Sequence, residues 1–256
     1  MTQTDDDRRR GATIQSIAVG ARFLEALAAA DGPQALGQLA RRTGSGSSTA
    51  HRYLQSLVRE GLARQDPASG LYDLGPSALA LGIAALKRID PVDIASAEMR
   101  RLAEESAASA GVAIWTERGP VLVRWHRSAI FSISSLGLGD ILPLDNTACG
   151  LVFQAHLAPA LIAVARASQP AAFRGSPPAP ETLAAIRRSR RAELTSHLLS
   201  GVTGQAAPVF DAQGGLACVI TTVADLNRMQ GPGEREAIFA AADRIAAQSG
   251  TAVFSR

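Results

Sequence analysis

The feature that most constrains this chain is the stretch from residue 44 to residue 61, GSGSSTAHRYLQSLVREG. Five of its residues recur with the spacing of one helical face: Ala50, Tyr53, Leu54, Leu57 and Val58. The opposite face holds hydrogen-bonding or cationic side chains and no carboxylate before Glu60: Ser47, Ser48, His51, Arg52, Gln55 and Arg59. The spacing therefore predicts an amphipathic helix with one buried and one polar face.

A second short helix is predicted directly upstream, over residues 35–43, and it stops at Gly44. Two short helices joined by a turn rich in Gly and Ser form a helix-turn-helix, whose second helix is shaped to enter a DNA major groove. The alternative is an ordinary helical hairpin inside a domain of another kind. The neighbouring segments favour the helix-turn-helix.

Those neighbours complete the outline of a winged helix-turn-helix. Helical spacing extends over residues 13–30, and two strand-like runs, 62–64 and 71–74, flank a turn that contains Pro and Gly. Residues 36–75 contain five arginines and three carboxylates, so we expect a weakly positive electrostatic field around this domain. We expect a disordered tail over 1–12, the winged domain over 13–76, a linker helix over 77–90, and a second domain over 91–256.

Composition narrows the class of protein without deciding its function. A chain of 256 residues with 46% hydrophobic and 19% charged residues is globular and long enough for two domains. All basic residues except Lys87 are arginines, which suit phosphates and guanine edges. Genomic base bias would produce the same enrichment.

The two cysteines, Cys149 and Cys218, are far apart and belong to no Cys/His cluster. We therefore expect neither a disulfide framework nor a metal or cofactor site. The longest apolar run, residues 78–86, is too short to cross a bilayer. The expectation is a soluble protein of the reducing cytoplasm.

The C-terminal two thirds predict an α+β domain on an antiparallel sheet, because hairpins rather than βαβ crossovers connect its strands. Asp90 and Pro91 are expected to open a helix that ends at Gly111. Strand patterns follow over 112–116, 121–125, 130–136, 141–144, 205–210 and 216–223. Helical patterns cover 147–157, 159–167, 181–194 and a terminal segment after residue 231.

At this level of detail the chain resembles the IclR family of bacterial transcription regulators over nearly its whole length. The resemblance is carried by IQSI at 14–17, STAHR at 48–52, GL at 61–62, DP at 66–67, GLYDLG at 70–75, LPL at 142–144 and AAPVFD at 206–211. It implies a winged helix-turn-helix, a linker helix and, over 91–256, a GAF-like effector-binding and oligomerisation domain that takes a small effector. It also implies dimers, often paired into tetramers, on palindromic double-stranded operators.

The chain departs from the family pattern mainly in the second domain. Gly46-Ser47 replaces the usual Pro-Lys before the recognition helix, and Leu151 replaces a basic residue. Residues 194–197 read LTSH where the family has an acidic run, and Gly204 stands in place of a frequent Cys. The last strand reads Thr-Thr-Val over 221–223 instead of Ser-x-Ser.

The candidate DNA contacts lie on or near the recognition helix: Ser47, Ser48, Thr49, His51, Arg52, Gln55, Arg41 and Arg64. Residues 47–49 are expected both to cap the helix and to touch a phosphate, because a helix N-terminus offers free N–H groups. Arg52 is the main candidate for reading a base, with a solvated surface charge as the alternative. Tyr53 is expected to pack in the core.

The resemblance points to pocket walls at Phe131, Ser134, Ala148, Cys149, Val202, Gly204, Thr221 and Val223. Ordinary core packing is the alternative for any one of them. Polar groups are few: Ser134, Thr147, Thr221 and the amides that open the 147–157 helix. Such a pocket suits a small, largely apolar effector, such as an aromatic acid, with at most one carboxylate, since burying unpaired charges is costly.

Nothing in the sequence marks a base for Cys149, because the His residues 126, 156 and 197 stand in no motif, so we expect no catalysis. We read the chain as a ligand-responsive DNA-binding transcription regulator acting as a homodimer or homotetramer. The alternative is a metabolite-binding module or enzyme with a vestigial helix-turn-helix.

Overall fold

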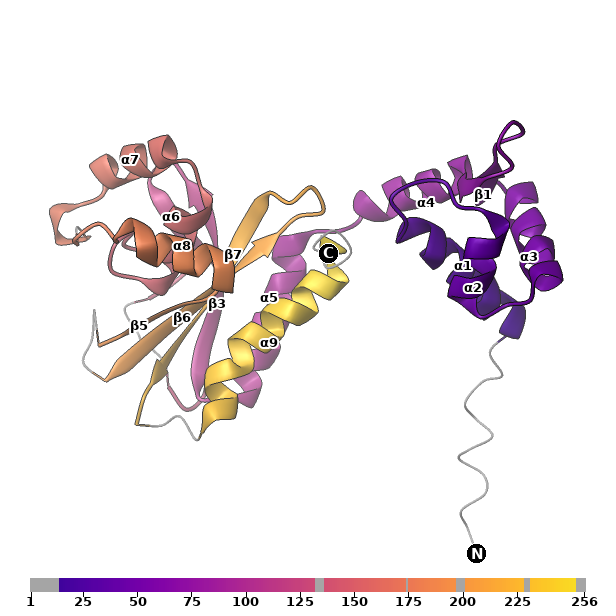
Figure 1. Ribbon diagram of the computed structural model, residues 1–256. Coiled ribbons are helices and arrows are strands. Elements are labelled where there is room, and N and C mark those ends of the chain that lie inside the picture. The colour runs from indigo at the N-terminus through magenta and orange to yellow at the C-terminus, as the bar shows by residue number, and fades with distance from the viewer. Residues whose placement is uncertain (1–13, 132–135, 174, 197–200, 228–230, 252–256) are drawn as a thin grey trace, which may run out of the picture. The chain divides into compact units, whose positions relative to one another are not determined.

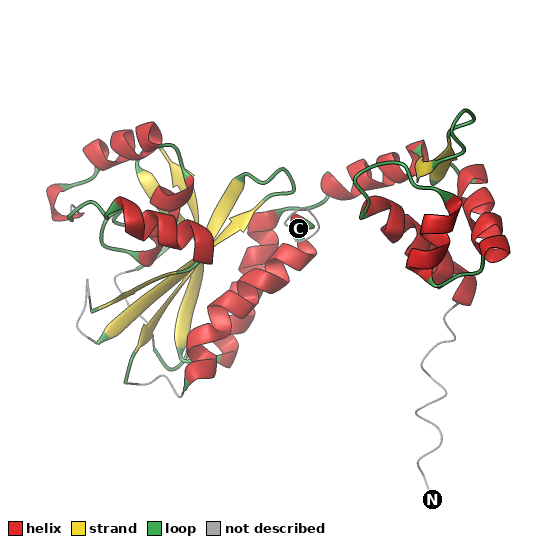
Figure 2. Cartoon of the chain, viewed as in Figure 1, coloured by secondary structure: helices red, strands yellow, loops and turns green. Residues whose placement is uncertain are grey.

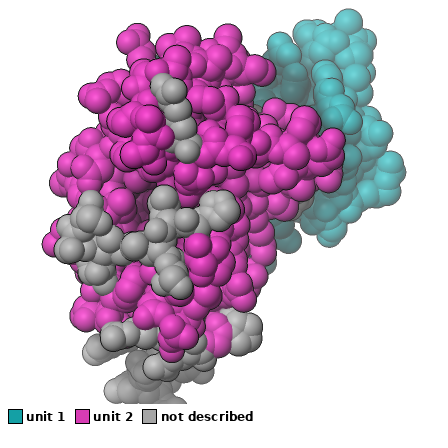
Figure 3. Space-filling view, turned by 90° about the vertical axis from the view of Figure 1, so that its left-hand side faces the viewer, with its two compact units in different colours: residues 1–88 teal, residues 89–256 magenta. Residues whose placement is uncertain are grey.

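The computed structural model describes residues 14–131, 136–173, 175–196, 201–227 and 231–251. The chain divides into two compact units, residues 1–88 and 89–256, which Figure 3 shows in different colours. No helix in the described ranges is long and apolar enough to cross a membrane. Each unit has its own hydrophobic core and is described separately below.

Unit 1 is a three-helix domain with a small hairpin and a following helix (Figure 1). Its elements are α1 (Gln15–Ala28), α2 (Leu36–Thr43), α3 (Ser47–Arg59), β1 (Ala63–Gln65), β2 (Tyr72–Leu74) and α4 (Pro76–Leu86). The core lies between α1, α2, α3 and the hairpin, and it is formed by Phe23, Leu27, Leu39, Ala40, Ala50, Leu54, Leu57, Ala63 and Tyr72. These elements confirm the predicted helix-turn-helix and hairpin.

The turn between α2 and α3 follows from its glycine. Gly44 adopts a left-handed conformation, with φ 64°, and its amide donates to the carbonyl of Arg41. The amide of Ser45 donates to the carbonyl of Ala40, so two carbonyls at the end of α2 are satisfied. The chain is then redirected into α3 within three residues.

The hairpin of unit 1 is antiparallel, with Ala63 opposite Leu74 and Gln65 opposite Tyr72. Its turn is organised by Asp66, whose carboxylate accepts hydrogen bonds from the amides of Ala68 and Ser69 and from the Ser69 hydroxyl. The hydroxyl bond is the main reason why the pKa of Asp66 lies below its usual value. The conformation of this hairpin, which is the wing, is therefore fixed by hydrogen bonds within its own turn.

Unit 2 is built on one five-stranded sheet (Figure 2). Its strands are β3 (Ala108–Thr116), β4 (Gly119–His126), β5 (Ala192–Thr195), β6 (Val202–Phe210) and β7 (Leu216–Asp225). Their order is β4-β3-β7-β6-β5, and every neighbouring pair is antiparallel. This confirms the predicted α+β class on an antiparallel sheet.

Helices cover both faces of this sheet. Helices α5 (Pro91–Glu105) and α9 (Pro232–Gln248) lie side by side on one face, and α6 (Ala148–His156) lies on the other with α8 (Pro180–Ser189) packed against it (Figure 1). Helix α7 (Pro159–Ser168) and a short 3-10 turn (Ala171–Phe173) follow α6 in the chain.

Strand residues alternate between these two layers, as period-two geometry requires. Val112 and Ile220 belong to the core under α5 and α9, whereas their neighbours Ala113 and Val219 belong to the core under α6. On β6, Ala206 faces α6. This alternation decides which candidate residues share a surface.

Helix α5 begins as predicted and ends earlier. The Asp90 carboxylate accepts from the amides of Val92 and Asp93, and Pro91 occupies the first turn. The prediction that the helix continues to Gly111 is wrong, because the Ser106 hydroxyl donates to the carbonyl of Leu102 and accepts from the amide of Ala108. Ser106 thus ends the helix, and Gly111 lies inside β3.

The predicted helix over 181–194 is also too long. Helix α8 ends at Ser189, Arg190 adopts a left-handed conformation with φ 55°, and Ala192–Thr195 forms the edge strand β5 beside β6. The charged residues of this segment keep helical spacing, but pairing with β6 outweighs that local preference.

The predicted strand over 130–136 is not found in its described part, because Ile130, Phe131 and Leu136 are irregular. Residues 132–135 lie outside the described residues. The predicted return at 141–144 is reduced to one antiparallel bridge between Ile141 and Val121.

Candidate nucleic-acid interface and effector face

Helix α3 begins without a side-chain cap. Its N-cap is Gly46, and no side-chain hydrogen bond closes the first turn. The prediction that Ser47, Ser48 and Thr49 cap the helix is therefore wrong, since all three stand inside it with exposed side chains. An uncapped, exposed first turn keeps its N–H groups available for a phosphate oxygen.

The buried face of α3 matches the predicted stripe. Ala50, Leu54 and Leu57 are buried, and Tyr53 packs against the same core with its ring stacked on Phe23 at a centroid distance of 6.0 Å. Because this stripe is anchored, the exposed side chains of α3 are held in a defined direction.

The exposed face of α3 has two edges. On the wing edge, the Gln55 amide donates to the side-chain oxygen of Gln65 at 3.2 Å and contacts the Tyr72 hydroxyl at 3.4 Å. On the other edge, Thr49, Arg52, Tyr53 and Ser56 line a shallow hollow together with Ser16 at the start of α1. Sequence reasoning missed Ser16 and Ser56 as candidates, and only their place beside Arg52 identifies them.

Arg52 is an unpaired cation among the described residues of the first half of this helix. Its side chain is exposed, and within the described part of the chain its guanidinium makes no hydrogen bond or ion pair. His51 is exposed beside it, and Arg41 is exposed in the last turn of α2. A guanidinium with all its donors open is able to bind a guanine edge or a phosphate in two-point fashion.

Arg64 is less available than the sequence suggested. Its guanidinium forms an ion pair with Asp73 across the hairpin, with a nitrogen–oxygen distance of 2.8 Å. This hydrogen bond is the main reason why the pKa of Asp73 lies below its usual value. The Arg64 guanidinium is therefore already engaged by a partner within the hairpin.

We expect Arg64→Ala to return the Asp73 pKa toward its ordinary value of 3.8, as followed by the carboxyl carbon shift in an NMR titration. The lowered pKa stabilises the folded unit above that ordinary value, and the stabilisation is lost as the pH falls through the folded-state value. Because the Arg64 side chain is 67% exposed, the loss at pH 7 should stay below about 1 kcal/mol. Equal losses in urea unfolding above and below the titration would contradict this account.

The candidate effector residues gather on the sheet face covered by α6. Thr221 and Val223 of β7 pair with Ala206 and Gly204 of β6, and Val223 also pairs with Ser109 of β3. The Ser109 hydroxyl donates to the carbonyl of Phe131 at 2.7 Å. That contact places Phe131 next to the cross-strand row formed by Ser109, Val223 and Gly204.

Val202 lies on the same face of the sheet, because it precedes Gly204 by two positions on β6. Ser134, the remaining predicted wall residue, lies outside the described residues. As effector contacts, all of these positions stay predictions.

The start of α6 supplies the polar part of this face. The Thr147 hydroxyl accepts from the amide of Gly150 at 2.9 Å and donates to the carbonyl of Pro143 at 2.7 Å, so Thr147 caps the helix. The neighbouring amides of Ala148 and Cys149 have no protein acceptor among the described residues. Thr221 donates to the carbonyl of Gln205, which leaves its oxygen lone pairs open.

Trp125 is a polar group on this face that sequence reasoning missed. Its ring lies over Gly111, where an added Cβ would approach ring atom Cε3 to 2.7 Å, and Gly111 pairs with Thr221 on its other side. The indole Nε1 is buried and has no hydrogen-bond partner among the residues that the structure describes. Buried donors are nearly always paired, so an open one beside Thr221 marks a place for an acceptor.

Cys149 is not placed to act as a nucleophile. The residue is 1% exposed within the core under α6, and burial raises the pKa of its thiol far above the usual range. A thiol held protonated in an apolar core is unreactive. Cys149 therefore packs as a core residue beneath α6.

Comparison with known proteins adds the family. The IclR helix-turn-helix domain model matches residues 16–67. The glycerol operon regulatory protein of Streptomyces griseus is 34% identical over 142 residues, which cover 56% of each chain. The transcriptional repressor IclR of Escherichia coli K12 is 27% identical over 146 residues, 56% of this chain and 53% of that protein. The match thus spans little more than half the length of these curated relatives.

Solved structures extend the likeness along the chain. Agrobacterium tumefaciens repressor BlcR has the same fold, with a TM-score of 0.74 at 18% identity over 93% of this chain and 98% of that one. Pseudomonas aeruginosa HmgR superimposes with a TM-score of 0.80 at 32% identity, covering 93% of this chain and 98% of that one. With a relative of that identity over almost its full length and the domain match at residues 16–67, the chain belongs to the IclR family of transcriptional regulators.

Proposed function

We propose that this protein is a homodimeric regulator that binds a palindromic operator through α3 and changes its DNA affinity when a small effector binds unit 2. The observation that carries the proposal is the exposed face of α3. It presents Arg52, His51 and Gln55 beside an uncapped first turn, and it holds no carboxylate before the helix ends. This is the pattern of donors that base edges and phosphates require.

Within this proposal the groups of α3 have separate tasks. The open amides of the first turn and the hydroxyls of Ser47 and Ser48 bind one phosphate and set the register of the helix. Arg52 reaches a base edge, and Gln55 is pre-positioned by its contacts with the wing. Arg41 and Arg64 add backbone contacts that carry no sequence information.

Helix α4 supports the dimer. It carries no charged residue between Pro76 and Leu86, and none of its residues is buried. Leu79 and Leu81 are 65% and 63% exposed, and Ile83 and Leu86 are exposed as well. A helix that is apolar all round is stable in water only when another surface covers it, and we assign that cover to a second copy of the chain.

A mobility-shift assay with the intergenic DNA upstream of the protein's own gene tests the proposal. We expect a complex that survives an excess of unrelated duplex and weakens steeply as salt rises. Binding that is equal for the upstream fragment and unrelated DNA would contradict operator recognition. No binding to either would favour the reading of a metabolite-binding module.

The effector that this face suits best is a small, largely apolar acid with one carboxylate. The amides at the start of α6, the Thr221 oxygen and the Trp125 indole N–H offer a few hydrogen bonds. Leu151 is buried, and Val223 offers only a methyl group where the family has a hydroxyl. A second carboxylate would find no cation among the described residues named for this face and would cost several kcal/mol.

We expect aromatic monocarboxylates to raise the melting temperature of the protein, whereas di- and tricarboxylates do not. Free ligand at about ten times its dissociation constant contributes about 1.4 kcal/mol, which corresponds to a rise of roughly 3–5 °C. Thermal-shift measurements over a panel of acids check this.

The matched variant for this measurement is Trp125→Phe, which keeps an aromatic ring over Gly111 and removes the open N–H. It should bind the same acids about 2- to 10-fold more weakly. Stabilisation by a tricarboxylate, with no effect of monoacids, would show that the assignment of the effector class is wrong.

A further inference from the structure

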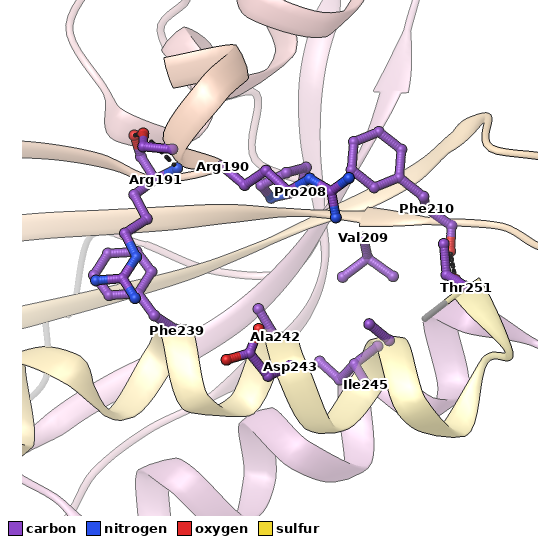
Figure 4. A pocket seen from close by; sticks show the side chains of 12 residues that line it. Arg190, Arg191, Pro208, Val209, Phe210, Phe239, Ala242, Asp243, Ile245 and Thr251 are labelled. Atoms are coloured by element: carbon purple, nitrogen blue, oxygen red, sulfur yellow. Dashed lines mark hydrogen bonds between the residues drawn. The ribbon is translucent and has the colours of Figure 1, made fainter. Parts of the chain in front are cut away.

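Unit 2 has a hollow of about 140 Å³ between the end of α8, strand β6 and helix α9. Figure 4 shows Arg190 and Phe210 at its upper rim, Val209 and Ile245 in its wall, and Asp243 on α9. A second hollow along the β6–β7 turn shares Arg190, Phe210 and Thr251 with it. Arg190 therefore stands where the two hollows meet.

Arg190 is held there at a conformational cost. It follows the last residue of α8 in the left-handed region, with φ 55°, where helices normally place Gly. Its guanidinium carbon lies 5.3 Å from the centroid of the Phe210 ring. A non-glycine residue in this conformation is a pointer to function when its side chain enters a hollow.

The guanidinium of Arg190 is open to a ligand, unlike those of Arg187 and Arg191. Arg191 is paired with Glu236 at 2.7 Å and lies over the Phe239 ring, and Arg187 donates to the carbonyl of Ala155. Arg190 makes no hydrogen bond or ion pair through its side chain with any described residue. Stacking on Phe210 covers one face of the group and leaves its N–H donors at the edge.

We propose that this hollow is a second small-molecule site, which binds an organic acid through one carboxylate on Arg190. Phe210, Ala242 and Ala246, which are only partly buried, provide an apolar wall, and a cavity of about 150 Å³ accommodates a benzene ring. The ligand therefore has an apolar body of about one ring. Asp243 is exposed at the hollow and unpaired among the described residues, so it repels a second carboxylate.

This site is separate from the effector face. Val209 belongs to the core under α9, whereas Ala206 on the same strand belongs to the core under α6. The hollow reaches the end of β6, where the Phe210 ring meets His156 of α6 at a centroid distance of 5.2 Å. Its lining shares no residue with the predicted effector positions Thr147, Thr221 and Val223. The proposal does not depend on DNA binding by unit 1.

Hydrogen exchange followed by mass spectrometry locates each ligand on the chain. With millimolar benzoate as the probe, we expect protection of residues 189–191, 208–214 and 242–246. The test variant is Arg190→Asn, because asparagine tolerates the left-handed conformation and the fold is kept. It should weaken this protection about tenfold or more in a benzoate titration, since a charge-assisted pair of hydrogen bonds is lost.

The matched control is Arg188→Asn, which removes the same charge from an exposed arginine of α8 that does not line the hollow. It should leave the protection unchanged. Protection confined to residues 147–152 and 221–223 would overturn the proposal, as would equal protection in Arg190→Asn. Equal protection by inorganic phosphate would also overturn it, because the apolar wall would then contribute nothing.

Discussion

Arg52→Ala is expected to abolish the preference of the protein for its operator. A side chain that makes a two-point contact with a base edge contributes about 1–3 kcal/mol of discrimination, which is roughly 5- to 150-fold in affinity. Arg52 lies in the first half of α3, exposed and unpaired among the described residues, and its helix is anchored to the core by Leu54 and Leu57. Titrations of operator and unrelated duplex measure the difference.

Arg59→Ala is the matched control, because Arg59 is exposed in the last turn of the same helix, far from the first turn. It should lower the affinity for both duplexes slightly and equally. If Arg52→Ala weakens both duplexes equally and reduces the salt dependence by about one ion, Arg52 binds a phosphate in the hollow beside Ser16 instead of a base. Unchanged operator affinity would exclude any contact.

Leu81→Glu is expected to convert the dimer into a monomer and to weaken operator binding by about 100-fold or more. Leu81 stands in the middle of the apolar helix α4, and a carboxylate placed in an apolar interface must be desolvated without a partner. A monomer reads only one half-site, so it loses the gain of simultaneous binding to both. Analytical ultracentrifugation and operator titration check the two consequences.

Lys87→Glu provides the control for added negative charge, because Lys87 is an exposed polar residue at the C-terminal cap of the same helix. The variant should remain a dimer and retain most of its operator affinity. A wild-type protein that sediments as a monomer and binds a single half-site tightly would refute the dimer. A Leu81→Glu variant that stays dimeric would move the interface away from α4.

Local signals were sufficient for most elements of unit 1. The apolar stripe of α3, the glycine at 44 and the turn at Asp66 each act within a few residues, and the structure reproduces all three. The cap of α3 was the exception. A shift of one residue gives the capping position to Gly46, and spacing alone does not fix a boundary that finely.

Unit 2 shows where local signals are overridden. The spacing of residues 181–194 favours a helix, but the strand β5 forms because β6 offers an edge to pair with. The end of α5 was misplaced because Gly111 resembles a helix stop, whereas its real role is to make room for the Trp125 ring. The pairing of β5 with β6 and the contact of Gly111 with Trp125 join residues distant in sequence, whereas Ser106 ends α5 through bonds within four residues.

The sequence by itself determined the class of each unit, the polar face of α3 and the family, because periodicity, turn residues and motifs are written in contiguous stretches. Only the tertiary structure decided which polar groups are open. It paired Arg64 with Asp73 and left the guanidinium groups of Arg52 and Arg190 and the buried Trp125 indole N–H without partners among the described residues. Pairing and burial depend on contacts between distant segments, and these form only when the chain is folded.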